Sequence, residues 1–253
     1  MMRKDEDIAA WCEARMASPA DFSPADGVDV SLLTRRETLA PGIERFAKTL
    51  PAGADPRAIG SLWSKAYTRA VLPSLFILAI RDGRNALDPA QAVPPGLVLL
   101  KDRPDQLALD AALPPRQTPE QIMTIALGQH MQSVFTALRD CTGLSPRVAW
   151  SNAGNMADFL FRRMAETPSL ADQAAQYEAL IMEPRQTPWF PRQNWLHAPL
   201  RTVSVILDGE AVPLRQRRIC CLRDRVPGMT LCSTCPRLSE AERRALVGQR
   251  HRH

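Results

Sequence analysis

Four cysteines within a sixteen-residue segment are the side chains of this sequence best suited to chemistry. Cys220 and Cys221 are adjacent, and after ten intervening residues Cys232 and Cys235 form a Cys-x-x-Cys pair. Thiolates are the ligands that soft metals and iron–sulfur clusters select, and a Cys-x-x-Cys turn directs two sulfurs at one site. Pro227-Gly228 lies between the two pairs and allows the chain to turn back. The segment therefore predicts a metal centre, and four thiolates suffice for a 2Fe-2S cluster.

Three kinds of chemistry fit these cysteines, and the spacing favours an iron–sulfur cluster over structural zinc or thiol–disulfide exchange. Structural zinc sites usually gather their sulfurs as two pairs, each pair with two to four intervening residues, so adjacent cysteines argue against zinc. A reducing cytosol disfavours a disulfide. In an extended strand Cys220 and Cys221 would point to opposite faces, so both can bind one cofactor only if the backbone bends there.

The cysteine segment also resembles a known family. The stretch RRICCLRDRVPGMTLCSTCP is similar to the signature of the FhuF-type ferric-siderophore reductases, and LWSKAYTRAVLPSL and WSNAGNMADFLF are compatible with that family's helical body. The resemblance implies that Cys220, Cys221, Cys232 and Cys235 all ligate a 2Fe-2S cluster. It further implies an oxidoreductase that reduces imported ferric siderophores by one electron in the cytosol and so releases ferrous iron.

Arginines are interleaved with the cysteine segment. Residues 201–253 contain eleven Arg against five Asp or Glu, whereas the whole chain carries a net charge of +5. Charge near a cluster shifts its potential, so these arginines could favour the reduced state; they could equally hold an anionic siderophore or form a solvated surface. Because they do not form a helical stripe with aromatic partners, nucleic acid is not expected as a partner. The four arginines concerned are Arg217, Arg218, Arg223 and Arg225.

The sequence lacks the common nucleotide-binding motifs, and this indicates where the electrons come from. It contains no Gly-x-Gly-x-x-Gly fingerprint after a strand and no Walker loop, so we expect the electrons to come from a separate ferredoxin or flavin reductase.

Two alternatives to a ferric-siderophore reductase remain open from the sequence. One is a regulatory or binding protein that holds zinc or a sensing cluster, and the other is a general 2Fe-2S electron carrier.

Several other reactive side chains are expected to be structural. Cys12 and Cys141 are isolated, and isolated cysteines are most often small buried hydrophobes. His130 lies beside an apolar helical face and is expected in the core, whereas His197 is a slightly better candidate for contacting substrate. Trp189 and Trp195 could line a pocket, although core packing is the more common role of such rings.

The predicted compartment is the cytoplasm, with peripheral contact at the inner membrane as a second option. The N-terminal sequence MMRKDEDIAAWCEARM has acidic residues where a signal peptide requires an apolar stretch. The longest apolar run, Ala70 to Ile80, is much shorter than the roughly 20 residues needed to cross a bilayer.

The surrounding pattern predicts an α+β protein, mainly helical with a small antiparallel sheet. We expect a helical body with a small β pair over residues 1–198, and a β-hairpin with the cluster-binding segment over residues 199–253. Asp55-Pro56 should begin a long helical stretch that Pro73 kinks or divides into a buried pair. A short antiparallel pair is expected over 96–110, with its turn at residues 102–105.

Two further helices and the hairpin complete the prediction. Thr118-Pro119-Glu120-Gln121 has the form of a helix start, and the helix should run to Gly143. Another should begin at Ser145-Pro146 and bury Ala149, Ala153, Met156, Leu160 and Met164. Asp208-Gly209 predicts a tight turn between two strands, which would make a rigid platform for the cysteines.

Overall fold

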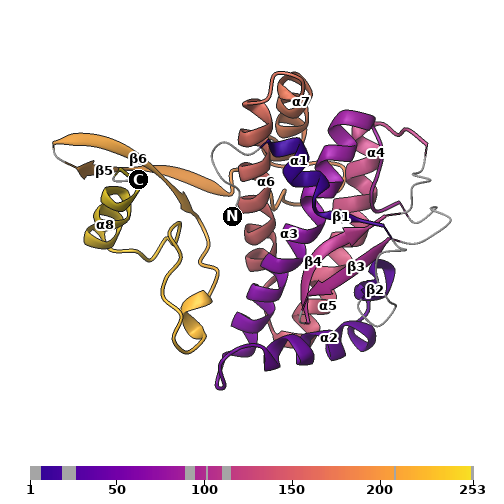
Figure 1. Ribbon diagram of the computed structural model, residues 1–253, viewed down its shortest axis with the longest axis horizontal. Coiled ribbons are helices and arrows are strands. Elements are labelled where there is room, and N and C mark those ends of the chain that lie inside the picture. Colours follow the sequence, from indigo (N-terminus) through magenta and orange to yellow (C-terminus); the bar gives the residue numbers. More distant parts are fainter. Residues whose placement is uncertain are drawn as a thin grey trace.

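The computed structural model describes residues 7–18, 27–88, 95–100, 102–109, 115–207 and 209–251. Its α-helices are α1 (Ile8–Glu13), α2 (Arg36–Lys48), α3 (Pro56–Asp82), α4 (Pro119–Met123), α5 (Gln132–Thr142), α6 (Pro146–Ala165), α7 (Ala171–Met182) and α8 (Glu240–His251). Its strands are β1 (Met16–Ala17), β2 (Gly27–Asp29), β3 (Gly96–Leu100), β4 (Arg103–Ala108), β5 (Leu200–Leu207) and β6 (Glu210–Arg217). The α+β fold is the predicted one (Figure 1).

Helix α3 runs through the middle of the body without interruption. Asp55 caps its first turn by accepting a hydrogen bond from the amide of Arg57, and Gly83 ends it in the left-handed conformation with φ 62°. The helix continues through Pro73, so the expected division into two helices is wrong. A proline in a helix interior removes one backbone hydrogen bond. Burial of nearly every side chain from 66 to 80 compensates for that loss.

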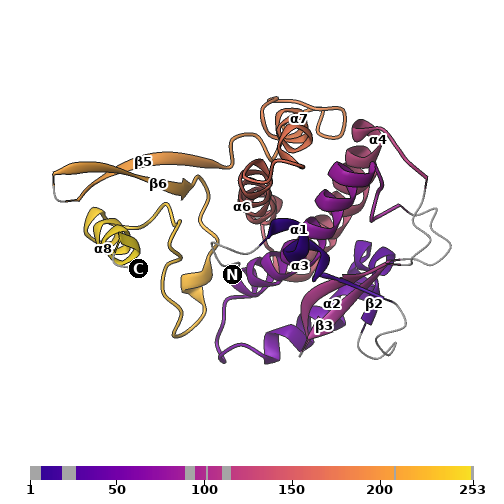
Figure 2. The same ribbon diagram turned by 45° about the horizontal axis from the view of Figure 1, so that its top comes forward.

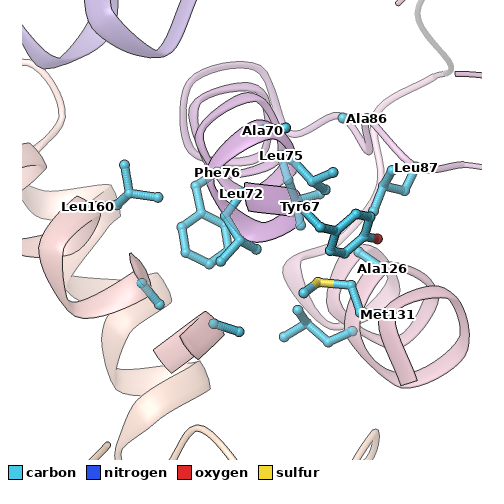
Figure 3. Packing of buried hydrophobic residues seen from close by; sticks show 14 of the residues in the cluster. Tyr67, Ala70, Leu72, Leu75, Phe76, Ala86, Leu87, Ala126, Met131 and Leu160 are labelled. Atoms are coloured by element: carbon cyan, nitrogen blue, oxygen red, sulfur yellow. The ribbon is translucent and has the colours of Figure 1, made fainter. Parts of the chain in front are cut away.

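The core packs around both sides of α3. Phe76 stacks on Phe161 of α6 with ring centroids 4.9 Å apart. Figure 3 shows Leu160 of α6 facing one side of α3, and Met131 lying on the other side with Tyr67. Helix α3 is thereby fixed against two neighbours, and its remaining face is free to carry polar groups.

That remaining face carries a polar stripe. Ser61, Lys65 and Arg69 are spaced four residues apart and therefore share one face of α3. The stripe faces the cysteine segment, because Lys65 and Ser61 both contact Cys221.

In the part of the chain that the structure describes, no helix is both long and apolar enough to cross a membrane.

The helical stretch after Thr118 begins as predicted but is less regular. Thr118 and Gln121 form a reciprocal capping box at the start of α4. Residues Thr124–Met131 then form a π-helical segment, η3, and α5 follows it and ends at Thr142, with Gly143 as its C-cap. Gly128 of η3 contacts Trp189 so closely that a Cβ there would lie 2.7 Å from the tryptophan Cβ. The apolar pattern predicted one helix and gave no sign of the π segment.

The sheet of the body has four strands in the order β1-β4-β3-β2. The predicted antiparallel pair is β3 and β4, but its turn comes earlier than expected, because β4 already begins at Arg103 and Asp102 adopts a φ of 60°. Strand β2 pairs antiparallel with β3, whereas β1 pairs parallel with β4, so the sheet is mixed rather than purely antiparallel. Two- and three-residue strands such as β1 and β2 are too short for a sequence pattern to reveal.

The predicted hairpin is confirmed as β5 and β6, which pair from Leu200 with Arg217 to Leu207 with Glu210. Gly209 has the positive φ of 86° that such a tight turn requires. The hairpin has its own small apolar cluster, in which Val205 and Leu214 pack against Val247 of α8. In Figures 1 and 2 the hairpin and α8 project to one side of the helical body. The boundary between residues 198 and 199 stays a prediction.

Candidate metal centre and adjoining cavity

The cysteine segment begins where strand β6 ends. The chain leaves the strand at Arg217, so Cys220 and Cys221 lie in irregular backbone, and Leu222 adopts a left-handed φ of 56°. The amide of Leu222 lies 3.4 Å from Sγ of Cys220. The backbone therefore bends at the adjacent cysteines, as their joint use as ligands requires.

The Cys-x-x-Cys turn is tied back to the end of the hairpin. The amide of Cys235 donates to the carbonyl of Cys232 at 2.9 Å, which closes the turn. The amide of Arg217 donates to the carbonyl of Thr234 at 2.8 Å, so β6 holds this turn directly beside the adjacent cysteines. A rigid hairpin thus fixes both ends of the motif.

The four sulfurs form two close pairs. Sγ of Cys220 lies 3.8 Å from Sγ of Cys235, and Sγ of Cys221 lies 3.6 Å from Sγ of Cys232. Two thiolates bound about 2.3 Å from one tetrahedral metal ion lie roughly 3.8 Å apart. Each pair therefore has the spacing of two ligands on one ion, with the adjacent cysteines contributing to different pairs.

Two close sulfur pairs are the arrangement that a cluster with two metal ions needs. A structural zinc site needs four ligands around one ion, whereas a 2Fe-2S cluster places two thiolates on each iron. The buried Nε of Arg217 also lacks a hydrogen-bond partner in the described structure, as expected beside a site that an anionic group fills.

Lys65 and Ser61 of α3 contact the second of the adjacent cysteines. Nζ of Lys65 lies 2.8 Å from Sγ of Cys221, and the Ser61 hydroxyl donates to the Cys221 carbonyl at 2.6 Å. The hydrogen bond with Cys232 and the positive charges of Lys65 and Arg217 lower the pKa of Cys221 to about 4, although burial opposes them. The same hydrogen bond raises the pKa of Cys232, so Cys221 is the member of this sulfur pair that ionises first.

Arg217 is buried behind the same sulfurs and is only 2% exposed. Its guanidinium donates to Oγ of Ser151 at 3.1 Å and to Oδ1 of Asn152. Burial lowers the pKa of Arg217, while all four cysteines raise it, Cys221 most strongly. The amide nitrogen of Asn152 donates in turn to Oγ of Ser64 at 2.8 Å. A polar network from α3 and α6 therefore surrounds a buried positive charge next to the cysteines.

The other three arginines of the segment differ in their surroundings. Nε of Arg218 donates to the carbonyl of Ala198 at 2.8 Å, and Arg225 forms an ion pair with Asp55 at 3.0 Å. Arg223 is half-buried and lines a cavity together with Arg217. The solvated-surface interpretation therefore does not apply to Arg217, and Arg218 and Arg225 make structural contacts.

This cavity adjoins the cysteines and has a volume of about 660 Å³. One wall is the polar stripe of α3 with Lys65 and Arg69, and another is Met156 of α6, which was expected to be buried but is only half-buried. Cys232 belongs both to the lining and to a sulfur pair, so a molecule in the cavity would lie directly beside a predicted cluster ligand.

None of the isolated cysteines, histidines and tryptophans singled out in the sequence lines the cavity beside the four cysteines. Cys12 is fully buried in the core and Cys141 is half-buried on α5. His130 is half-buried, and its Nε2 lies 2.9 Å from the hydroxyl of the buried Tyr67. Trp189 is buried, and Trp195 is half-buried beside the core. His197 lines a separate polar cavity with Arg185 and Arg192.

Sequence reasoning missed the contribution of the helical body to the site. Lys65 lies in the segment LWSKAYTRAVLPSL and Asn152 in WSNAGNMADFLF, both of which were matched to a family without any role for these residues. One signal was available, namely polar residues at four-residue spacing within an otherwise apolar helix. Nothing local indicated that this stripe meets residues 220–235.

Two models of known protein families match this chain. Residues 61–206 match the family described as "Ferric iron reductase FhuF-like transporter", and residues 217–237 match "FhuF 2Fe-2S C-terminal domain". The first match spans more than half of the chain, so this protein belongs to the FhuF-type ferric iron reductase family. Its C-terminal segment accordingly holds a 2Fe-2S cluster. No curated protein matches the sequence.

Two solved structures from Klebsiella pneumoniae are distantly similar. ATP-bound aerobactin synthetase IucA is 14% identical with a TM-score of 0.49, over 62% of this chain and 32% of the synthetase. Aerobactin synthetase IucC is 17% identical with a TM-score of 0.49, over 71% of this chain and 38% of the synthetase. The chain thus spans about a third of the length of each synthetase, and such a likeness supports no conclusion about function.

Proposed function

We propose that this protein reduces ferric iron bound to siderophores and so releases ferrous iron in the cytosol, with peripheral contact at the inner membrane as a further possibility. The observation that carries the proposal is the position of Cys232, which belongs to a sulfur pair and also lines a cavity large enough for a small molecule. Electron transfer to a bound chelate requires this kind of close approach.

Reduction of the bound ferric ion requires no covalent catalysis by the protein. Siderophores hold ferric iron with hard oxygen donors, and adding one electron gives a less charged ferrous ion that those donors attract more weakly. When bound, the cluster supplies electrons one at a time. Lys65 and Arg217 stabilise negative charge at the cysteines, and the rigid hairpin keeps the sulfurs in place during the change of charge.

The electrons are proposed to come from a separate donor, either a ferredoxin or a flavin reductase. For each ferric ion reduced, the donor loses one electron through the protein, and no proton or covalent bond has to move. The proposed partners are therefore a ferric siderophore and a redox protein, without nucleic acid.

A turnover assay tests this function. Protein with its cluster is supplied with ferredoxin and a ferredoxin reductase under anaerobic conditions, and ferrous iron released from several ferric siderophores is trapped with a coloured chelator. Cytochrome c serves as an unrelated acceptor. We expect faster transfer to at least one ferric siderophore than to cytochrome c. Equal rates would indicate a general electron carrier, and a reducible cluster that passes electrons to neither acceptor would indicate a sensor.

A further inference from the structure

The two sulfur pairs differ in the charges that surround them. Cys221 and Cys232 form the pair that adjoins the cavity, here called the cavity pair. Cys220 and Cys235 form the second pair. Each pair has one buried and one half-buried cysteine, so exposure to solvent does not distinguish the two. Charges and hydrogen bonds near the sulfurs are the remaining factors that decide how readily each iron accepts an electron.

The cavity pair lies beside two positive charges. Nζ of Lys65 is 2.8 Å from Sγ of Cys221. Arg217 is only 2% exposed, so solvent screens its charge little. All four cysteines raise the pKa of Arg217, and Cys221 and Cys232 raise it more than the cysteines of the second pair do. Arg217 therefore interacts more strongly with the cavity pair than with the second pair.

Around the second pair the charges largely cancel. The carboxylate of Asp224 lies 3.9 Å from Sγ of Cys220 and also forms an ion pair with Arg237. Asp224 raises the pKa of Arg237 more than Cys220 does. The side chain of Arg237 is also 55% exposed, so solvent screens its charge. The second pair thus has one negative charge and one screened positive charge beside it.

Neutral hydrogen bonds do not reverse this difference. The sulfurs of the second pair accept hydrogen bonds from two backbone amides, those of Leu222 and Arg237. The ammonium of Lys65 instead donates a charge-assisted bond to Cys221, and such bonds are about twice as strong as neutral ones. The surroundings therefore stabilise added negative charge at the cavity pair more than at the second pair.

We propose that the electron taken up by the cluster resides on the iron held by Cys221 and Cys232, beside the cavity, while the iron held by the second pair stays ferric. Lys65 and Arg217 are positioning residues for this electron, because they act through the sulfurs. One electron from the donor converts two ferric ions into one ferrous and one ferric ion. Its transfer to a chelated ferric ion makes that ion ferrous and restores the oxidised cluster, and no proton moves.

The consequence is a direction for electron transfer. The reduced iron lies on the side of the cluster from which a molecule in the cavity can take the electron, since Cys232 lines that cavity. The use of the electron on a siderophore rests on the proposed function, whereas the location of the electron does not.

Paramagnetic NMR of single labelled cysteines locates the electron. Native chemical ligation between Leu231 and Cys232 joins residues 1–231 to a synthetic peptide of residues 232–253. The full chain then carries ¹³Cβ in Cys232 alone or in Cys235 alone. The cluster is reconstituted and reduced with dithionite, and spectra are recorded at several temperatures. On warming, hyperfine shifts of ligands on ferric iron decrease and those of ligands on ferrous iron increase, because the two iron spins are coupled antiparallel.

We expect the ferrous pattern for Cys232 and the ferric pattern for Cys235. The reverse assignment, or the same pattern for both cysteines, would overturn the proposal. Dithionite supplies the electron, so the result does not depend on any siderophore. If the expected patterns appear but no ferric siderophore is reduced in the turnover assay, the proposed function fails while the location of the electron stands. Turnover with the reverse assignment would leave the function and remove this inference.

Two variants test the electrostatic cause without ligation, in protein whose cysteines all carry ¹³Cβ. Lys65→Met removes the charge beside the cavity pair, so the shifts of the two pairs should become more alike. Arg237→Gln is the matched control, because it removes one positive charge beside the second pair and should keep the parent pattern. The visible spectrum reports whether each variant holds its cluster. Unchanged shifts in Lys65→Met, or a larger change in Arg237→Gln, would contradict the proposed cause.

Discussion

Lys65 and Cys221 are 156 residues apart in the sequence, yet Nζ of Lys65 lies 2.8 Å from Sγ of Cys221. The contact joins the helical body to the cysteine segment. It also places a positive charge against a proposed cluster ligand. Because one-electron reduction makes a 2Fe-2S cluster more negative, this charge favours the reduced form.

Replacing Lys65 should therefore make the cluster harder to reduce. Lys65→Met should lower its midpoint potential by about 50 mV, since a one-electron couple changes by about 59 mV for each 1.4 kcal/mol. Lys48→Met, at an exposed position of α2, is the control and should leave the potential unchanged. A redox titration followed by visible absorption measures both. Equal potentials for Lys65→Met and the parent protein would remove Lys65 from the tuning of the cluster.

The cysteine variants test the ligand set. Cys232→Ser should abolish the visible absorption of the cluster and reduce the iron content from about two atoms per chain to nearly none. Cys141→Ser should retain both, because Cys141 lies on α5 and near the backbone of Arg36 rather than near the other sulfurs. Full iron content in Cys232→Ser would mean that another group holds the metal.

Much of the architecture was predictable because local signals determined it. Thr118 and Gln121 predicted a capping box, Asp208-Gly209 predicted a hairpin turn, and the cysteine spacing indicated the cofactor. The undivided α3 was not predictable, because tertiary burial offsets the hydrogen bond lost at Pro73. In the site, the cysteines were predictable from the sequence, but the residues that surround them were not. The cysteines are local in sequence, whereas the groups of α3 and α6 that surround them become neighbours only through folding.

Close packing of α6 against the start of the hairpin should be sensitive to one added methyl group. A Cβ at Gly154 would lie 2.5 Å from Cβ of Pro199, which precedes β5. Gly154→Ala should therefore lower the free energy of unfolding by about 1–2 kcal/mol, since overpacking outweighs the better helix propensity of alanine. In the control Gly42→Ala on α2, the added Cβ meets no atom within 4 Å apart from its chain neighbours and the backbone of its own helix, so stability should be equal or higher. Urea denaturation distinguishes the two, and a gain in both variants would contradict the tight contact.

Acid should weaken the core through His130. Burial lowers the pKa of His130 to about 4 from its ordinary value of 6.5, while Asp29 slightly opposes the shift. The fold therefore favours the neutral imidazole. This contribution is complete above about pH 6.5 and is lost as the pH falls toward 4.

Between pH 7 and pH 5.5, His130→Gln should consequently lose about 1 kcal/mol less unfolding free energy than the parent protein. Urea denaturation at several pH values measures this difference. Gln can still form a hydrogen bond with the Tyr67 hydroxyl, so the variant should fold. Identical pH dependence in both proteins would show that His130 does not titrate across this window.

The most direct test of the central claim is a single-turnover experiment in a stopped-flow instrument. Protein reduced with dithionite and freed of excess reductant is mixed anaerobically with a ferric siderophore and a ferrous chelator. We expect the oxidised cluster spectrum to return, with about one ferrous ion trapped for each chain, because a 2Fe-2S cluster transfers one electron. A cluster that stays reduced while no ferrous iron appears would contradict the account.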